Sequence, residues 1–282
     1  MYALEEMQLK LADLVDIALA GGHEVMTVYK EGGTVEDKAD GSPVTEADVR
    51  CEAVILKGLE GLAPGVPVVA EEAASAGRVP QTCERFFLVD PLDGTKEFIN
   101  RNGEFTVNIA LVEAGVPVAG IVYAPALGLL YLGSRAGGAF KAEVAADGRL
   151  GPKQPIAVRP TPERIVAVGS RNHGSAETAE WLRRFDVERF ASRGSSLKFC
   201  LVAEGEADVY PRLGRTMEWD TAAGDAVLRA AGGTVTTLGG APLAYGKRDQ
   251  VGDSDFANPW FVAWGDPDLS TQAVPSTGPR RS

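Results

Sequence analysis

An apolar strand that runs directly into an acidic turn constrains this chain more than any other feature of its sequence. Residues 85–89 are mostly apolar, and Asp90 and Asp93 follow them three positions apart. The residues of this segment favour a turn, because Pro91 fixes its own φ and Gly94 tolerates a left-handed conformation. A turn accounts for one aspartate as a capping residue, but not for the other acids that occupy similar settings along the chain.

Those other acids lie in three further segments, at the ends of predicted helices and strands: Glu71 and Glu72, Asp40 and Asp48, and Asp220 and Asp225. Four separated segments of this kind indicate a metal cage. With only two histidines and three cysteines in the chain, the ligands would be carboxylate oxygens, which favour Mg²⁺ first and Mn²⁺ as a substitute. A calcium-binding EF-hand is a poor alternative, because Ala39 and Gly41 stand where that motif needs oxygen ligands.

Without metal, the predicted cage would carry a large negative charge. Glu71, Asp90, Asp93 and Asp220 are four carboxylates with a formal charge of −4, so they would repel one another and any phosphate. Two divalent ions cancel that charge. Metals roughly 3.5–4 Å apart also hold an attacking water and a leaving oxygen in line. The acids therefore predict phosphoryl-transfer chemistry.

The composition excludes several other classes of protein. Lys and Arg number 28 against 39 Asp and Glu, a formal net charge of −11, so the surface repels nucleic acid polymers and anionic membranes. The most apolar stretch, 105–132, is too interrupted by polar, Gly and Pro residues to span a bilayer. The cysteines form no disulfide framework, which favours a reducing compartment. We expect a cytoplasmic monomer or homodimer with a small-molecule substrate.

Hydrophobic periodicity predicts two halves with different organisation. The first half has long helices at about 3–30 and 46–61 and an antiparallel meander between residues 106 and 141. The second half alternates strands and helices, as expected for a sheet with helices on both faces. Four prolines within 151–162 mark a linker. The expected units are therefore an α+β unit over 1–157, an α/β unit over 158–268 and a flexible tail over 269–282.

Four segments, taken in order, resemble the signature segments of the lithium-sensitive, metal-dependent phosphatases typified by inositol monophosphatase. They are KADGSPVTEAD at 38–48, AEE at 70–72, DPLDGT at 90–95 and WDTAAG at 219–224. An ordered set is far more specific than any one motif, and the resemblance spans roughly residues 5–265. It implies a layered αβαβα sandwich of the inositol monophosphatase and fructose-1,6-bisphosphatase type, two or three Mg²⁺ ions per site, and lithium sensitivity.

The same resemblance assigns roles to individual residues. It implies these metal ligands: Glu71, Asp90, the backbone carbonyl of Leu92, Asp93 and Asp220. Asp48 and Thr95 then form the pair that takes a proton from the attacking water, since a threonine hydroxyl alone is a feeble base. An ordinary helix cap is the alternative role for Asp48. The backbone N–H groups of Gly94 and Thr95, at a predicted helix start, would hold phosphate oxygens. We expect supporting or structural roles for Glu72, Asp40 and Asp225.

Two further segments, 93–110 and 192–212, resemble the bacterial 3′(2′),5′-bisphosphate nucleotidases within this family. A nucleoside bisphosphate keeps a second phosphate away from the reacting one, and Lys198 and Arg212 are suitable cations for it. The position aligned with Arg212 is acidic in inositol monophosphatases, so its reversed charge argues for a second anionic group on the substrate. A solvated helix face is the simpler role for Lys198.

The resemblance also implies nucleotide contacts from two loops. His173 would lie against the adenine ring, with capping of the following helix as the simpler alternative. Ser195 would bind the nucleotide together with Lys198, and the neighbouring Ser196 is an alternative that sequence does not separate from it.

The expected reaction is hydrolysis of the 3′-phosphate of adenosine 3′,5′-bisphosphate (PAP) to AMP and phosphate, in sulfur assimilation, with its sulfated relative PAPS as a second candidate substrate. The family resemblance also allows peripheral association with the inner membrane. One alternative is an inositol monophosphatase or another sugar phosphatase of the same fold. The other is a metal- or nucleotide-binding protein without turnover, which the presence of both Thr95 and Asp48 disfavours.

Overall fold

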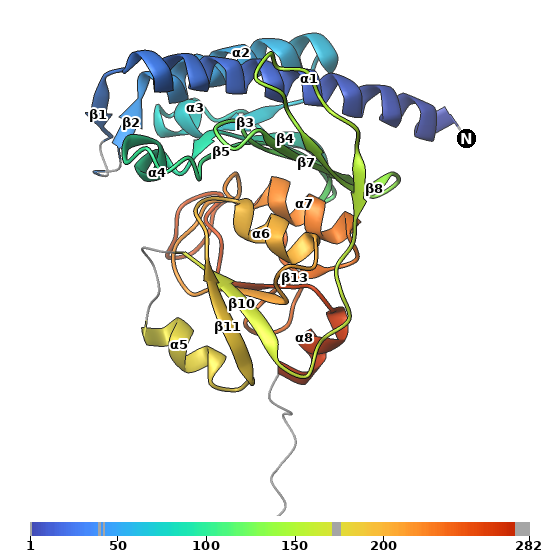
Figure 1. Ribbon diagram of the computed structural model, residues 1–282. Helices are drawn as coiled ribbons and strands as arrows, with labels where there is room; N and C mark the ends of the chain where they lie inside the picture. Colours follow the sequence, from blue (N-terminus) through green and yellow to red (C-terminus); the bar gives the residue numbers. More distant parts are fainter. Residues whose placement is uncertain (1, 39–40, 42, 171–175, 274–282) are drawn as a thin grey trace, which may run out of the picture.

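Helices and sheets alternate in five layers (Figure 1). The computed structural model describes residues 2–38, 41, 43–170 and 176–273. Helices α1 (Tyr2–Glu31) and α2 (Glu46–Leu62) cover one sheet, a second pair of helices lies between the two sheets, and a third pair covers the far side of the second sheet. This is the αβαβα arrangement that the resemblance implies, and the first two helices begin and end within one residue of their predicted bounds.

The first sheet has seven strands in the order β3-β4-β5-β6-β7-β8-β9. They are β3 (Val68–Ala70), β4 (Arg85–Asp93), β5 (Thr106–Glu113), β6 (Val116–Ala124), β7 (Leu129–Ser134), β8 (Gly138–Glu143) and β9 (Gln154–Ile156). All neighbours pair antiparallel except β3 and β4, which are parallel. Ala70 pairs with Val89, so the next residue along each segment, Glu71 and Asp90, emerges beside the other at one edge of the sheet.

The second sheet has five strands in the order β11-β10-β12-β14-β13. They are β10 (Ile165–Gly169), β11 (Val187–Ser192), β12 (Val209–Arg212), β13 (Thr234–Thr237) and β14 (Phe261–Trp264). Helices α5 (Ala176–Leu182) and α8 (Pro267–Ala273) pack on one face, where Trp181 and Leu269 share a buried cluster with Trp264. Helices α6 (Leu197–Ala203) and α7 (Ala222–Ala230) lie on the other face, as predicted for this half.

Two glycines let α7 approach the first sheet closely. A Cβ on Gly120 of β6 would lie 2.5 Å from the carbonyl oxygen of Ala223. A Cβ on Gly133 of β7 would lie 2.6 Å from the Cα of Val227. Any larger residue would push the helix away, because such distances are well inside van der Waals contact. The glycines therefore bring Asp220, two residues before α7, towards the acids at the ends of β3 and β4.

Four short elements complete the described chain: β1 (Val35–Asp37), β2 (Pro43–Thr45), α3 (Glu71–Ser75) and α4 (Thr95–Ile99). Strands β1 and β2 form a two-stranded antiparallel sheet. Helices α3 and α4 begin immediately after β3 and the acidic turn of β4, respectively. Both short helices therefore start at the edge of the first sheet where the acids lie.

The division into two units stays a prediction. The passage from the first sheet to the second falls between β9 and β10, around the predicted boundary near residue 158. However, one buried cluster contains residues of both sheets together with α6 and α7. The polypeptide around the boundary also adds β9 to the first sheet by pairing with β8, so it is more than a linker.

The predicted start of the flexible tail is corrected. Residues 267–273 form α8, and Leu269 is only 4% exposed. An apolar contact with the second sheet therefore orders the first part of that segment, which a search for helical periodicity overlooks in so short a helix. The rest of the predicted tail, 274–282, lies outside the described residues. Within the described part of the chain, no helix is long and apolar enough to cross a membrane.

Candidate active site

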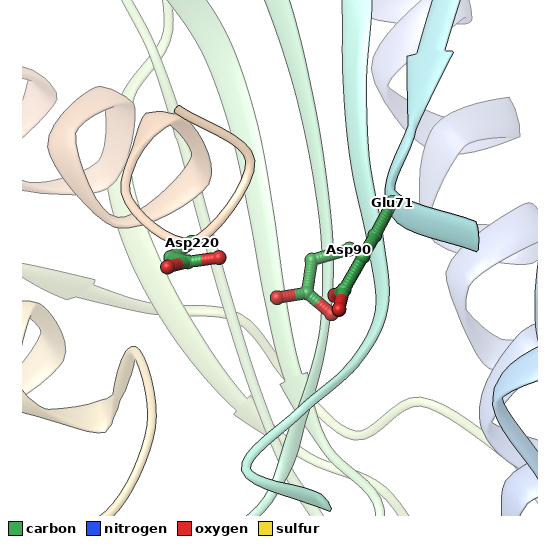
Figure 2. Close-up of side chains that lie close together, drawn as sticks. All are labelled: Glu71, Asp90 and Asp220. Atoms are coloured by element: carbon green, nitrogen blue, oxygen red, sulfur yellow. The ribbon is translucent and has the colours of Figure 1, made fainter. Parts of the chain in front are cut away.

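Three carboxylates from three different segments converge at the edge of the first sheet. Glu71 follows β3, Asp90 lies on β4 and Asp220 precedes α7, and each offers an oxygen within 4.8 Å of the others. Figure 2 shows the side chains of Glu71 and Asp90 beside each other, with Asp220 facing them from the α7 side. This cluster contains three of the predicted metal ligands.

The electrostatics of this cluster fit a divalent cation. Burial raises the pKa of Asp90 well above its ordinary value, and the charges of Glu71, Asp93 and Asp220 raise it further. Burial likewise raises the pKa of Asp220, again reinforced by Asp93 and Glu71. Like charges held together away from water are costly unless a cation compensates them. All the donors are hard oxygens, the type that Mg²⁺ and Mn²⁺ prefer.

Asp93 stands beside this cluster and is held by hydroxyl groups. Its Oδ2 accepts hydrogen bonds from Ser195 Oγ at 2.7 Å and from Ser196 Oγ at 3.1 Å. The pairing of β4 with β5 is irregular between Asp90 and Asp93. The side chains of the two aspartates therefore do not follow the regular alternation between the two faces of a strand. The backbone of Leu92, another predicted ligand, connects them: its N–H donates to Asp90 Oδ1 at 3.0 Å, and its carbonyl accepts from Thr95 Oγ1.

Asp48 is a helix cap, and it also lies beside Thr95. Its Oδ2 accepts the Thr45 N–H at 2.7 Å and the Thr45 hydroxyl at 2.6 Å, which completes a capping box at the start of α2. Its Oδ1 remains available and lies 3.4 Å from Thr95 Oγ1. Burial raises the pKa of Asp48 to about 6, although the hydrogen bonds from Thr45 oppose the shift. The carboxyl group therefore has a proton affinity suited to acid and base chemistry near neutral pH.

Gly94 forms the junction between the acidic turn and α4. Its φ of 93° is in the left-handed region that glycine adopts without strain. The next residue, Thr95, begins the helix. Gly94 and Thr95 both line the site cavity, with Glu71, Asp93 and Asp220.

That cavity has a volume of about 330 Å³ and joins the acids to basic and aromatic side chains. Lys198 and Arg212 line it, and so do Tyr210 and Thr216, which sequence analysis did not single out. Both belong to the segment around β12, and nothing in the local pattern distinguishes a strand tyrosine that lines a cavity from one in the core.

Lys198 is buried, which contradicts the alternative that it lies on a solvated helix face. It is 6% exposed, its Nζ donates to the carbonyl oxygen of Ser195, and it lies 5.4 Å from the centre of the Tyr210 ring. Burial, reinforced by the charge of Arg212 and opposed by that of Asp93, lowers the pKa of Lys198 to about 8. Such a cation gains from any anion that enters the cavity.

Arg212 offers unused hydrogen-bonding capacity at the cavity wall. Its Nη2 donates to the carbonyl oxygen of Arg215 at 3.0 Å. Its Nε is buried and, in the part of the chain that the structure describes, has no hydrogen-bond partner. A buried N–H of a charged group without a partner is costly, so a ligand oxygen at this point would stabilise it.

The two candidate serines differ in their surroundings. Both line the cavity, but Ser195, with a φ of 53°, is 9% exposed and Ser196 is 2% exposed. Both hydroxyls lie within hydrogen-bond distance of Asp93 Oδ2, so neither is free in the way that a dedicated nucleotide contact would be. His173 and Asp40 lie outside the described residues.

Lys38 and Glu52 contact the site although sequence analysis gave them no role. Lys38 Nζ lies 2.6 Å from Glu71 Oε1 and 2.7 Å from Glu72 Oε1. Burial would lower the pKa of Lys38, but Glu71 and Glu72 raise it above its ordinary value. The Glu52 carboxylate accepts the N–H groups of Glu72 at 2.7 Å and Ala73 at 2.8 Å, so it holds the first turn of α3. Lys38 begins the first signature segment, and Glu52 follows Asp48 by one helical turn.

The remaining supporting acid is internal to the fold. Asp225 on α7 is buried, bonded to Arg229 at 2.6 Å and to the Tyr245 hydroxyl at 2.9 Å. It therefore has the structural role predicted for it.

Known proteins similar to this chain are phosphatases and nucleotidases of one family. The model of the inositol monophosphatase family matches residues 7–263. The chain is 47% identical over 255 residues to 3′(2′),5′-bisphosphate nucleotidase CysQ of Escherichia coli K12, covering 89% of this chain and 98% of that protein. The crystal structure of CysQ from Bacteroides thetaiotaomicron superposes with a TM-score of 0.74 at 38% identity, covering 92% of this chain and 97% of that one. An inositol monophosphatase from Anabaena gives 0.71 at 26% identity, covering 96% and 98%.

Proposed function

The chain belongs to the inositol monophosphatase family, and from that premise we propose that it is a metal-dependent 3′(2′),5′-bisphosphate nucleotidase. Its substrate is adenosine 3′,5′-bisphosphate, from which it releases the 3′-phosphate and leaves AMP. The similarity to the nucleotidase CysQ, at 47% identity over most of both chains, supports this choice within the family.

The observation that carries the substrate choice is the presence of buried cations in the same cavity as the acids. Lys198 is almost fully buried, and Arg212 has a buried N–H without a partner among the described residues. Cations in such positions need an anion, and the reacting phosphate belongs at the acidic end with the metal ligands. A substrate with a second, remote phosphate satisfies both ends of the cavity, whereas an inositol monophosphate has only one phosphate to offer.

The acids are the groups that would hold Mg²⁺: Glu71, Asp90, Asp93, Asp220 and the carbonyl of Leu92. Bound divalent ions would cancel the charge of these acids and align the attacking water with the leaving oxygen. We propose that two or three ions bind at each site. The carboxylate oxygens of Glu71, Asp90 and Asp220 lie within 4.8 Å of one another, which supports a shared ion among them.

The remaining residues position the substrate and move a proton. The backbone N–H groups of Gly94 and Thr95, at the start of α4, bind oxygens of the reacting phosphate. Thr95 Oγ1 takes the proton of the attacking water as its own proton passes to Asp48 Oδ1, 3.4 Å away. The pKa of Asp48, raised by burial to about 6, suits it to accept that proton at neutral pH.

A phosphate-release assay on three substrates tests the proposal. With Mg²⁺ present, we expect adenosine 3′,5′-bisphosphate to be hydrolysed with a higher kcat/KM than inositol 1-phosphate or fructose 1,6-bisphosphate. Excess chelator should abolish turnover. Ca²⁺ should inhibit, because its longer and more flexible coordination disfavours the in-line arrangement.

Two outcomes would contradict different parts of the proposal. If inositol 1-phosphate were the best of the three substrates, the chain would be a sugar phosphatase of the same fold. If turnover persisted in excess chelator, the metal assignment itself would be wrong.

A further inference from the structure

The hydroxyl of Ser196 joins three segments that come from two layers of the fold, the first sheet and the helices between the sheets. It lies 3.1 Å from Asp93 Oδ2 at the end of β4, and 2.8 Å from the carbonyl oxygen of Asp220 before α7. It also lies 3.0 Å from Nδ2 of Asn108 on β5. Ser196 and Asn108 are 2% and 1% exposed, so water does not compete for these contacts.

Ser196 stands at a position where its side chain would ordinarily stabilise its own helix. It is the N-cap residue of α6, and a serine there commonly accepts a backbone N–H of the first turn. The Ser196 side chain makes no such bond. Its hydrogen-bonding capacity is directed away from α6 and towards the two acidic segments.

Asn108 determines the direction of these hydrogen bonds. Its Oδ1 lies 3.0 Å from the Thr106 hydroxyl, which also contacts the Ser195 hydroxyl, and its Nδ2 faces Ser196 and donates to it. The single hydroxyl hydrogen of Ser196 must then point to Asp93 Oδ2 or to the Asp220 carbonyl, both of which are acceptors. Asn108 therefore prepares Ser196 as a donor to the acidic segments.

We propose that Asn108 and Ser196 are a positioning pair, which holds Asp93 and the Asp220 segment at the separation that metal binding requires. The pair acts on metal affinity and makes no contact with the nucleotide. This inference rests on the proposed metal-dependent function. Groups that orient metal ligands by hydrogen bonding commonly change metal affinity when they are removed.

The test is calorimetric titration of Mg²⁺ into the purified full-length Ser196→Ala variant without substrate. We expect the dissociation constant for Mg²⁺ to rise roughly tenfold or more. The KM for adenosine 3′,5′-bisphosphate at saturating Mg²⁺ should change less than twofold, since this hydroxyl is already engaged by three groups of the protein. A role in folding alone would lower the thermal midpoint without altering metal affinity.

Ser134→Ala is the matched control. Ser134 is also a buried serine, 1% exposed, and its hydroxyl accepts the Gly137 N–H at 2.9 Å on β7. Loss of that hydroxyl removes a buried hydrogen bond of similar kind, remote from the cavity. Its dissociation constant for Mg²⁺ should equal that of the unmodified protein even if its thermal stability falls.

Asn108→Ala supplies a second, independent measurement. Because Asn108 acts through Ser196, the loss of Mg²⁺ affinity in the double variant should be clearly smaller than the sum of the losses in the two single variants. Full additivity would show that the residues do not act as a pair.

The inference is overturned if Ser196→Ala binds Mg²⁺ as tightly as the unmodified protein. A raised KM for the nucleotide with unchanged metal affinity would instead make Ser196 a substrate contact. Phosphate release by the unmodified protein tests the nucleotidase assignment, and Mg²⁺ titration tests the role of Ser196. If the unmodified protein binds Mg²⁺ but does not hydrolyse the nucleotide, the nucleotidase assignment fails while the result for Ser196 still stands.

Discussion

Thr95 Oγ1 lies 3.4 Å from Asp48 Oδ1, and this contact joins the first turns of two helices that are far apart in sequence. The other oxygen of Asp48 is engaged by Thr45 at the N-terminus of α2. The capping interaction therefore fixes the carboxylate while leaving one oxygen for Thr95. One side chain thus caps a helix and is also placed to take the proton that the proposed reaction passes through Thr95.

Thr95→Ala should lower kcat by roughly 100-fold or more, because it removes the hydroxyl that passes the proton to Asp48. Metal affinity should not change, since the hydroxyl is not a charged ligand. Steady-state kinetics combined with calorimetric metal titration measure the two effects. Thr95→Ser retains the hydroxyl and is the control, which should keep most of the activity. Equal loss in both variants would argue against the hydroxyl as the active group.

Asp220→Asn should lower metal affinity and turnover together. The amide retains the shape of the side chain but not its charge, so the loss of affinity should exceed the roughly tenfold expected for a supporting hydrogen bond. The metal-free variant should also unfold at a higher temperature than the unmodified protein, because it removes one of several like charges. Calorimetry and thermal denaturation in chelator measure these effects. Asp93→Asn should likewise lower metal affinity, and unchanged affinity in both variants would mean that the cage is misplaced.

Arg212→Ala should raise KM for adenosine 3′,5′-bisphosphate by roughly tenfold or more, if the charged contact is worth about 1.5–3 kcal/mol. The remote phosphate is bound equally in ground and transition states, so KM responds before kcat. For 3′-AMP, which lacks that phosphate, the change should be much smaller. Kinetics on both substrates decide the matter, and an equal effect on the two would contradict the assignment of Arg212 to the second phosphate.

The KM for the bisphosphate should rise as the pH passes above about 8. Burial lowers the pKa of Lys198 to about 8, and Arg212, Asp93, Glu97 and Glu104 also act on it. The ammonium form that binds the remote phosphate is therefore complete below this pH and lost above it. KM measured between pH 7 and 10 at saturating metal reports the titration. With Lys198→Met the rise over this range should disappear, and its persistence would assign it to another group.

Local sequence patterns were sufficient for several elements of the fold. The apolar spacing of α1 and the turn residues of the meander between β5 and β8 depend on near neighbours, so their predicted bounds agree closely with the structure. The order of the second sheet, β11-β10-β12-β14-β13, depends on contacts between strands distant in sequence. No local pattern reports such contacts. The predicted tail over 269–282 includes most of the short helix α8, because the stability of this helix comes from Leu269 packing on the second sheet.

Sequence alone determined the chemistry available at the site: four separated acidic segments without histidine or thiolate ligands, and a lysine and an arginine in the segment that follows α5. It also identified the family, because the motifs and their order can be read directly from the sequence. The tertiary structure decided what each group faces. It buried Lys198, left one oxygen of Asp48 for Thr95, and placed the Ser196 hydroxyl between Asp93 and the Asp220 segment. Burial and hydrogen-bond direction depend on which layers pack together, and here the close approach of α7 to Gly120 and Gly133 sets that packing.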